Sequence, residues 1–244
     1  MLRLALVLVA VAAEALAAQP MTRQAVAQAV AAAAGNPDHA PDFSGRDLSG
    51  LDLTGLNLSR VKFVNSTLVN TKFTRDTMFA ADLSGAHAHG ANFDGATLDV
   101  GVFRGTDLTQ ASFRGASVYA VIMLGADLSG ADLTDARLIG AMGDAKLVNA
   151  KLVDLKGGAD MRNQPMGLMR TDLTGADLTG ADLTGANLQH ARLVRTNLTN
   201  ATLTRADVAN ADVNAAIFHG ARGRDSMIGW TKALNTDQAI LDHP

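Results

Sequence analysis

A five-residue period in the spacing of apolar residues constrains this chain more than any other feature of its sequence. From Pro41 the chain divides into units such as RDLSG, ADLSG and ADLTG, and the middle position of nearly every unit is Leu, Phe or Met. Neither the 3.6-residue period of a helix nor the alternation of a strand matches this spacing. A chain that turns a corner every five residues does match it, so the sequence predicts a solenoid.

Each position of the unit predicts a direction for its side chain. The first position, mostly Ala, and the third, mostly Leu or Phe, are two residues apart and therefore point to the same side, the interior. The second, fourth and fifth positions are rich in Asp or Asn, Ser or Thr, and Gly, and are predicted to face water. Gly at the corner permits a positive φ. Four such sides predict a coil of about twenty residues, stacked at the β-strand spacing of roughly 4.8 Å.

The units resemble those of the pentapeptide-repeat family, whose repeat is summarised as A(D/N)LXX. ADLSG, ADLTG and ANLQH are near-ideal copies, and the similarity covers most of residues 41–220. The resemblance implies an all-β fold, a right-handed quadrilateral β-helix with four units per coil. Arg46 and Asp76 depart from the pattern because they occupy first positions. We expect Asp76 to hydrogen bond to neighbouring backbone groups or hydroxyls, since buried polar groups normally find partners; a functional buried acid is the alternative.

The pattern divides the chain into six parts. These are a signal peptide (1–18), a capping helix and linker (19–40), a first repeat segment (41–140), an irregular segment (141–170), a second repeat segment (171–220) and a C-terminal cap (221–244).

The first part has the layout of a secretory signal peptide. Arg3 gives a basic start, residues 4–13 form an apolar run, and Ala15-Leu16-Ala17 supplies a small-x-small pattern. Cleavage is expected after Ala17 or Ala18. A buried N-terminal helix of a cytosolic protein is the alternative interpretation.

Two short segments are predicted to close the solenoid. Residues 24–34, capped by Thr22 and with Val26 and Val30 one turn apart, indicate a helix that covers the first coil.

At the other end, the repeat decays after Gly220, and Trp230 is predicted to plug the open core. A short helix through Leu234 and Ile240 is expected to follow.

The repeat breaks in the irregular segment. The frame slips between Leu138 and Leu147, where AMGD replaces a full unit. A bulged coil that joins two stacked segments is the favoured interpretation, and a partner-binding projection is the alternative. Thioethers bind Cu(I), so a soft-metal loop is a further alternative, although Met more often fills gaps. Its ligands would be Met161, Met166 and Met169.

Residues twenty apart are predicted to stack, so outward-facing ladders follow directly from the sequence. One ladder contains Ser59, Phe79, Asp99, Tyr119 and Ile139. The next contains Asp42, Lys62, Asp82, Val102 and Ile122. Their apolar members and two neighbours are predicted to form one outward patch, the apolar edge: Phe79, Val100, Val102, Tyr119, Ile122, Leu124 and Ile139. Such a patch favours a binding partner, unless the 141–170 segment or the C-terminal tail covers it.

Two further ladders are polar. His87 and His89 point to one side with Asp107 stacked next to them, a pattern that could hold a divalent metal, although exposed His near Asp is common. Another ladder indicates surface charge pairing between coils and contains Asp172, Arg192 and Asp212.

Charge and composition exclude several classes of protein. The 21 Lys and Arg nearly balance the 24 Asp and Glu, which argues against a nucleic-acid-binding stripe and against an acidic nucleic-acid mimic. The absence of cysteine excludes disulfides, thiolate zinc sites and cysteine nucleophiles. No nucleophile–base–acid set, phosphate loop or HExxH motif is present, so we assign no catalytic residue, metal or cofactor and do not expect an enzyme.

The favoured interpretation is a non-catalytic bacterial solenoid, secreted or periplasmic, that serves as a protein-interaction scaffold. Its partner is unknown and could be a second copy; neither nucleic acid nor a membrane span after cleavage is expected. The resemblance implies an alternative, because some pentapeptide-repeat proteins mimic B-form DNA in the cytoplasm and bind DNA gyrase, conferring quinolone resistance. Metal or small-ligand capture by His87 and His89, or by the methionines, is a second alternative.

Overall fold

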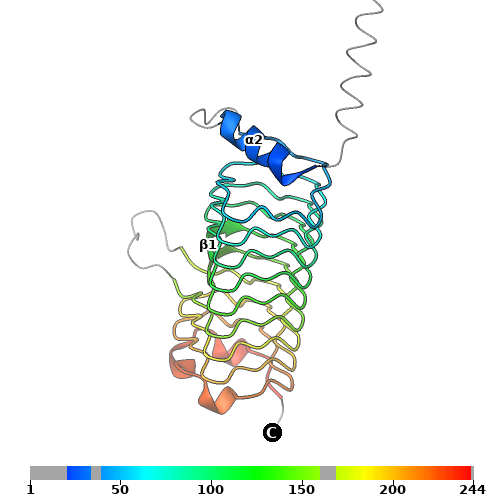
Figure 1. Ribbon diagram of the computed structural model, residues 1–244. Helices are drawn as coiled ribbons and strands as arrows, with labels where there is room; N and C mark the ends of the chain where they lie inside the picture. Colours follow the sequence, from blue (N-terminus) through cyan, green and yellow to red (C-terminus); the bar gives the residue numbers. More distant parts are fainter. Residues whose placement is uncertain (1–20, 34–39, 160–168, 243–244) are drawn as a thin grey trace, which may run out of the picture.

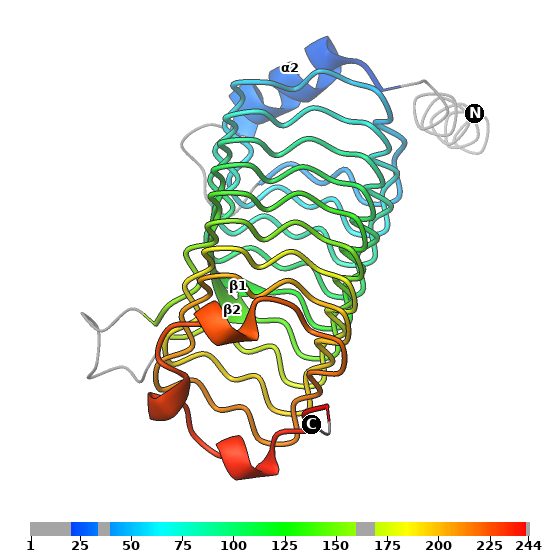
Figure 2. The ribbon, with the colours of Figure 1, turned by 90° about the horizontal axis from the view of Figure 1, so that it is seen from below.

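The computed structural model describes residues 21–33, 40–159 and 169–242. These residues form a β-solenoid, an elongated stack of coils with a helix across one end and three short 3-10 turns at the other (Figure 1). Seen from below, the coils lie over one another around a common interior (Figure 2). The predicted repeat solenoid is confirmed, and the right-handed sense of the coil stays a prediction.

Parallel bridges between second-position residues define the coil. Asp42 bridges Lys62, which bridges Asp82, and steps of twenty residues continue through the first segment. Because each five-residue unit makes one such bridge, four units complete a turn. The only regular strands among the described residues are the parallel pair β1 (Ser117–Ile122) and β2 (Arg137–Ala141). The all-β expectation therefore holds mostly as isolated bridges, since each unit spends its other residues on a corner.

First- and third-position side chains fill the interior, as predicted. Nearly all of them are fully buried in one continuous apolar cluster. Along one side of the coil, the rings of Phe73, Phe93 and Phe113 stack with centroids 5.0 and 4.8 Å apart. Burial of each such side chain contributes roughly 1.5–3 kcal/mol to folding. Ala between these layers lets the backbones of the four sides approach one another.

Second- and fourth-position side chains shape the corners. The Oδ1 atom of Asp177 accepts hydrogen bonds from the backbone N–H and the hydroxyl of Thr179, at 3.0 and 2.6 Å. The same arrangement recurs along the coil and holds the turn, whose fifth residue has positive φ: 63° at Gly125 and 54° at Asn65. Many of these polar residues were predicted only to face water, but they also fix the backbone.

Helix α2 (Arg23–Ala33) covers the first coil, as predicted. The hydroxyl oxygen of Thr22 accepts the N–H of Ala25 at 3.1 Å and so caps the helix. Val26 is fully buried in the core cluster, and Val30 packs against it. No helix of the described residues has the length and apolar character needed to cross a membrane.

The C-terminal end is a coil of six-residue units, and the predicted short helix through Leu234 and Ile240 is wrong. Three 3-10 turns follow one another at six-residue intervals: η3 (Arg224–Ser226), η4 (Trp230–Lys232) and η5 (Thr236–Gln238). Each begins after a residue of positive φ, namely Gly223, Gly229 and Asn235. The bridging residues also recur every six positions and are Ile228, Leu234 and Ile240. One added residue per side gives room for the 3-10 turn at each corner.

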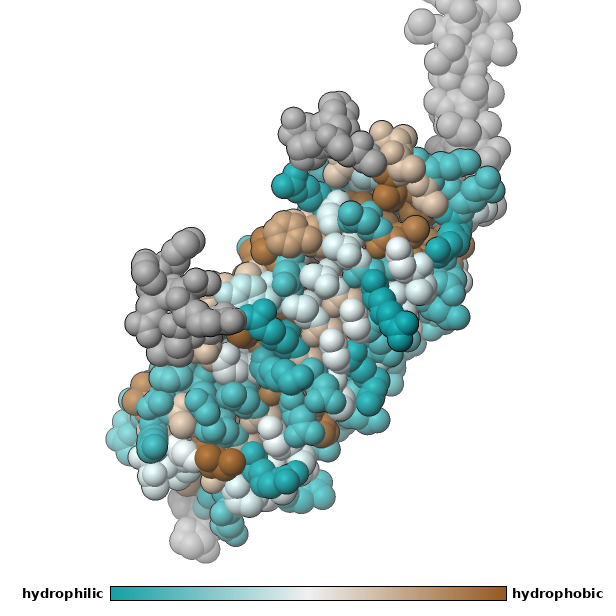
Figure 3. Space-filling view, turned by 60° about the vertical axis from the view of Figure 1, so that its left-hand side comes forward, coloured by the Kyte–Doolittle hydropathy of each residue, from teal (hydrophilic) through white to brown (hydrophobic). Residues whose placement is uncertain are grey.

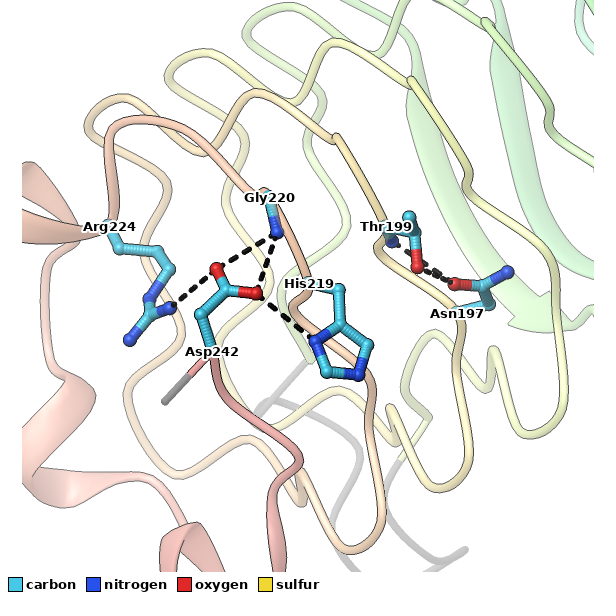
Figure 4. Close-up of polar contacts among 6 residues, drawn as sticks. All are labelled: Asn197, Thr199, His219, Gly220, Arg224 and Asp242. Carbon is cyan, nitrogen blue, oxygen red and sulfur yellow. Dashed lines mark hydrogen bonds and ion pairs between the residues drawn. The ribbon is translucent and has the colours of Figure 1, made fainter. Parts of the chain in front are cut away.

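Two contacts close this last coil. Trp230 meets Phe218 edge-on at 5.5 Å between centroids and packs against the core, as expected of a plug. The carboxylate of Asp242 accepts the backbone N–H of Gly220 at 2.9 Å and contacts Nδ1 of His219 at 3.1 Å (Figure 4). The Gly220 N–H, with His219, holds the pKa of Asp242 below its ordinary value. The chain end is thereby tied to the preceding coil.

A one-residue deletion joins the two segments of the solenoid. Leu138 and Met142 are successive buried third-position residues but are only four positions apart. The register between β1 and β2 shifts at a bulge, where Gly140 faces Val121. A Cβ atom at Gly140 would meet backbone atoms of Val121, its carbonyl oxygen among them. Only glycine therefore fits this position.

The next coil carries both the insertion and a band of lysines. Lys156 and Asp172 bridge their neighbours as successive second-position residues but are sixteen positions apart instead of five. Lys146 bridges Asp127 and Asp177, and its Nζ atom lies 3.7 Å from Asp127. Lys146 and Lys151 each lie between two aspartates, which favours this pairing of coils, although each exposed ion pair contributes at most about 1 kcal/mol.

Replacing Gly140 by alanine should destabilise the solenoid more than the same change at an ordinary corner. Gly125→Ala is the matched control, because Gly125 has φ +63° and open space around an added Cβ. The control should cost about 1–2 kcal/mol for the left-handed backbone. Gly140→Ala should cost a further ~1–3 kcal/mol, because the methyl group overlaps Val121. Urea unfolding followed by circular dichroism measures the stability of both variants. Equal losses of stability would contradict the close approach of Gly140 to Val121.

Candidate protein-binding edge

The apolar edge spans one side of the solenoid and the two corners that border it, and it includes part of β1. Three of its residues have large exposed side chains: Phe79 is 42% exposed, Val100 45% and Leu124 37%. The bridges from Asp82 to Val102 and on to Ile122 confirm the predicted ladder. Among the described residues, the other exposed large apolar side chains all belong to the C-terminal coil. The repeat body therefore concentrates its exposed apolar residues here.

The middle of the edge is held in place by polar contacts. Val102, Tyr119 and Ile122 are half-buried. The Oδ1 atom of Asp99 accepts the hydroxyl of Ser117 at 2.6 Å and the backbone N–H of Tyr119 at 3.1 Å.

On the other side of Tyr119, the guanidinium of Arg137 lies 4.0 Å from the centre of the ring. A cation over an aromatic face is attracted to it, so Arg137 helps to fix the ring. The sequence placed Asp99 in the ladder of Tyr119 but not in the edge, and Arg137 was missed. The twenty-residue spacing from Ser117 to Arg137 would have placed Arg137 near Tyr119.

Ile139 does not belong to the exposed edge, and this part of the prediction is wrong. Its side chain is only 3% exposed, although it is absent from the core cluster that contains Leu138 and Met142. The physical reason is the deletion. With four positions instead of five between Leu138 and Met142, β2 runs on as an extended strand, and Ile139 loses the outward fourth position that the regular frame predicts.

A pocket borders the C-terminal end of the edge. It has a volume of about 340 Å³ and is formed where the bulge of β1 and β2 meets the chain that returns from the insertion. Its lining includes Ala120, Ile122, Ala141, Met169, Arg170 and Asp172. The edge thus passes from exposed side chains at Phe79 into a partly enclosed, mainly apolar hollow.

Two segments were expected to be able to cover the edge, the C-terminal tail and the 141–170 segment, and the structure places them differently. Residues 221–242 close the C-terminal end of the solenoid, several coils away from β1, so the described C-terminal tail does not cover the edge (Figure 1). From the 141–170 segment, Met169 and Arg170 reach the pocket beside Ile122. Residues 160–168 lie outside the described residues. Figure 3 shows the side of the molecule that lies on the left in Figure 1, where apolar areas lie between polar ones.

The other candidate sites bring few ligands together. His87 bridges Asp107, and Nδ1 of His89 lies 2.8 Å from the hydroxyl of Thr109. Within the described ranges, no three or more His, Cys, Asp or Glu side chains gather as metal ligands would. Met161 and Met166 lie outside those ranges.

The predicted charge ladder on the second segment is confirmed. Asp172, Arg192 and Asp212 bridge in succession, and the guanidinium of Arg192 lies 3.3 Å from the Asp172 carboxylate.

Comparison with known proteins addresses the same repeats. A family model described as pentapeptide repeats matches the chain in eight copies, over residues 42–75, 78–115, 111–154, 168–189 and 181–220. No curated protein matches the chain.

Two solved structures illustrate the similarity. HetL, a pentapeptide repeat protein involved in heterocyst differentiation regulation from the cyanobacterium Nostoc sp. strain PCC 7120, is 24% identical, with 90% of this chain and 94% of HetL covered and a TM-score of 0.46. A trypsin-treated form of QnrB1, a plasmid-mediated fluoroquinolone resistance protein, is 18% identical, with 81% and 92% covered and a TM-score of 0.46. Because the family matches extend over most of the chain and follow the units that form its coils, the chain belongs to the pentapeptide-repeat family.

Proposed function

We propose that the chain is a non-catalytic scaffold that binds a protein partner through the apolar edge. The observation that carries the proposal is the exposure of Phe79, Val100 and Leu124 at the two corners that border one side of an otherwise polar repeat body. Covering an apolar surface area with a partner removes that area from water, which contributes favourably to the free energy of binding.

The scaffold suits this role because its backbone is already ordered. Each unit is tied to the coils on both sides by backbone hydrogen bonds, such as Leu83 N–H to Val102 O at 2.7 Å. A partner that docks on such a surface does not have to order it, so less of the interaction energy is lost on binding. The half-buried ring of Tyr119, fixed by Arg137, offers a rigid aromatic contact of the kind that dominates interfaces.

We also propose that the mature protein acts outside the cytoplasm, as a right-handed quadrilateral solenoid. The support is the layout of residues 1–18, with a basic start, an apolar run and a small-x-small pattern. The near balance of 21 basic and 24 acidic side chains favours this proposal over the acidic DNA-mimic alternative.

Polar substitution of the exposed edge should abolish capture of the partner. The triple variant Phe79→Ser, Val100→Ser and Leu124→Ser removes the exposed apolar area, and we expect at least a tenfold loss of partner recovery. Because the chain has no cysteine, a photo-crosslinker on Val100→Cys reports contacts at this edge alone. Recovery from the native host is measured by mass spectrometry.

The matched control carries Val69→Ser, Val148→Ser and Val153→Ser, three half-buried fourth positions on other sides of the coil. It should retain the partner, and a crosslinker on Val69→Cys should not capture it. Equal capture of the partner by the crosslinkers at positions 100 and 69, or retention of the partner by the triple edge variant, would contradict the proposal.

Two residues of one ladder should respond differently to the same change. Phe79→Ser should alter the free energy of unfolding by less than about 1 kcal/mol, because the side chain is 42% exposed and lies outside the core. Ile139→Ser should cost ~2 kcal/mol or more, because it removes a buried side chain. Thermal unfolding compares them, and similar losses would show that the two side chains are equally accessible in solution.

Fractionation of the native host, with mass spectrometry of the mature N-terminus, tests the location. We expect a chain that starts near Ala18 or Gln19 outside the cytoplasm. An uncleaved chain in the cytoplasm would contradict secretion, and inhibition of gyrase supercoiling would then be the assay for the alternative function.

A further inference from the structure

The coil beneath the N-terminal end has a polar inner layer. Ser66, Thr71 and Asp76 are consecutive first-position residues, and all are buried where most other coils have alanine. The Thr71 hydroxyl donates to the carbonyl oxygen of Leu48 at 2.9 Å, and Asp76 Oδ1 accepts the N–H of Leu56 at 3.0 Å. Both bonds tie the second coil to the first, which lies directly under α2.

Asp76 is incompletely paired in this layer. Its side chain is 1% exposed, and its Oδ2 atom has no hydrogen-bond partner among the described residues. Burial raises the pKa of Asp76 to about 7, against the opposing effects of the Leu56 and Gly55 N–H groups and of Arg23. The charge of Asp52 adds to the increase. At neutral pH the Asp76 carboxyl group is therefore partly ionised, although its site is poorly solvated.

The same corner of the first coil also anchors the helix. The Arg23 guanidinium of α2 donates to the carbonyl oxygens of Asp52 and Thr54, the latter at 3.0 Å. From the second coil, Asp76 accepts the backbone N–H of Leu56, two residues after Thr54. Asp52 itself pairs with Lys72 at 3.8 Å and with Arg23 at 3.9 Å. The corner is thus gripped by α2 on one side and by a buried acid on the other.

We propose that the protonation state of Asp76 controls the closure of the N-terminal cap, defined here as α2 with the first coil, residues 40–60. The neutral acid holds the cap closed, and loss of its proton loosens the cap. In the closed state an ionised Asp76 is stabilised by the Leu56 and Gly55 N–H groups and by the charge of Arg23, but its Oδ2 atom has no hydrogen-bond partner among the described residues and burial outweighs these effects. Opening the first coil lets water reach the carboxylate, so ionisation shifts the equilibrium toward the open cap.

The direction with pH follows from linkage. In the open cap the carboxyl group has its ordinary pKa near 3.8, and in the closed cap a pKa of about 7. The contribution of Asp76 to closure is therefore complete below about pH 4 and is lost as pH rises to about 7, with no further change above. Opening exposes the apolar end of the core, which includes Val26 and Phe43.

The loosening should stay local and independent of the apolar edge. In a solenoid each coil contacts only its neighbours, so an end coil can open while the rest remains folded. Trp230 and the C-terminal coil lie at the far end of the stack (Figure 1).

Hydrogen exchange of the full chain, read by mass spectrometry between pH 5 and 8.5 and corrected for intrinsic rates, tests the proposal. The N–H groups of Leu48, Leu53 and Leu58 donate to the second coil and report the cap. Their protection should fall with pH by up to about tenfold per unit and level off above pH 7. Amides of Leu178 and Leu188, in distant coils, should show no such change.

Asp76→Asn is the decisive variant, because its amide oxygen can still accept the Leu56 N–H but cannot ionise. Protection of the cap should become independent of pH. Asp76→Ala introduces the residue that is common at the first position and should also remove the pH dependence. This variant should fold even if the solenoid does not accommodate the side-chain amide of Asp76→Asn. Flat protection in the unmodified protein, or an unchanged slope in either variant, would overturn the proposal.

Discussion

The structure depends on one constraint: parallel backbone hydrogen bonds join residues that are twenty positions apart. This register places first and third positions inside and stacks every other position into ladders on the surface. Asp or Asn at the second position and Ser or Thr at the fourth hold the corners that keep the register in step, as Asp177 and Thr179 show. A change of one residue in the spacing therefore changes the pairing between the coils on either side of it, as the nineteen-residue step from Asp127 to Lys146 shows.

That sensitivity explains the joint between the two segments. The short spacing from Leu138 to Met142 requires a bulge, glycine at position 140 and an extended β2, and it removes Ile139 from the surface. The insertion then leaves and re-enters at the same corner, where Met169 and Arg170 line a pocket. The pocket lies where the regular frame is interrupted, and it adjoins the apolar edge because Ile122 belongs to both, whereas the rest of the edge lies on regular coils.

The two ends solve the problem of open coils differently. At the N-terminus, α2 lies across the first coil, and Arg23 and Asp76 hold one corner from opposite sides. At the C-terminus, a six-residue unit turns the last coil with 3-10 geometry, and Trp230 and Asp242 close it. A buried acid at the first end makes that closure responsive to protons, whereas the second end relies on aromatic packing and exposed polar contacts.

The sequence alone determined the period, the inward and outward positions, the capping of α2 by Thr22 and the ladder of Asp172, Arg192 and Asp212, because each follows from local spacing. Only the tertiary structure decided the burial of Ile139, the six-residue terminal coil, the stacking of Arg137 on Tyr119 and the orphan oxygen of Asp76. The reason is physical. A repeat predicts what lies twenty residues away while its register holds, but at a deletion, an insertion or an end the partners of a side chain are set by coils that the local pattern does not describe.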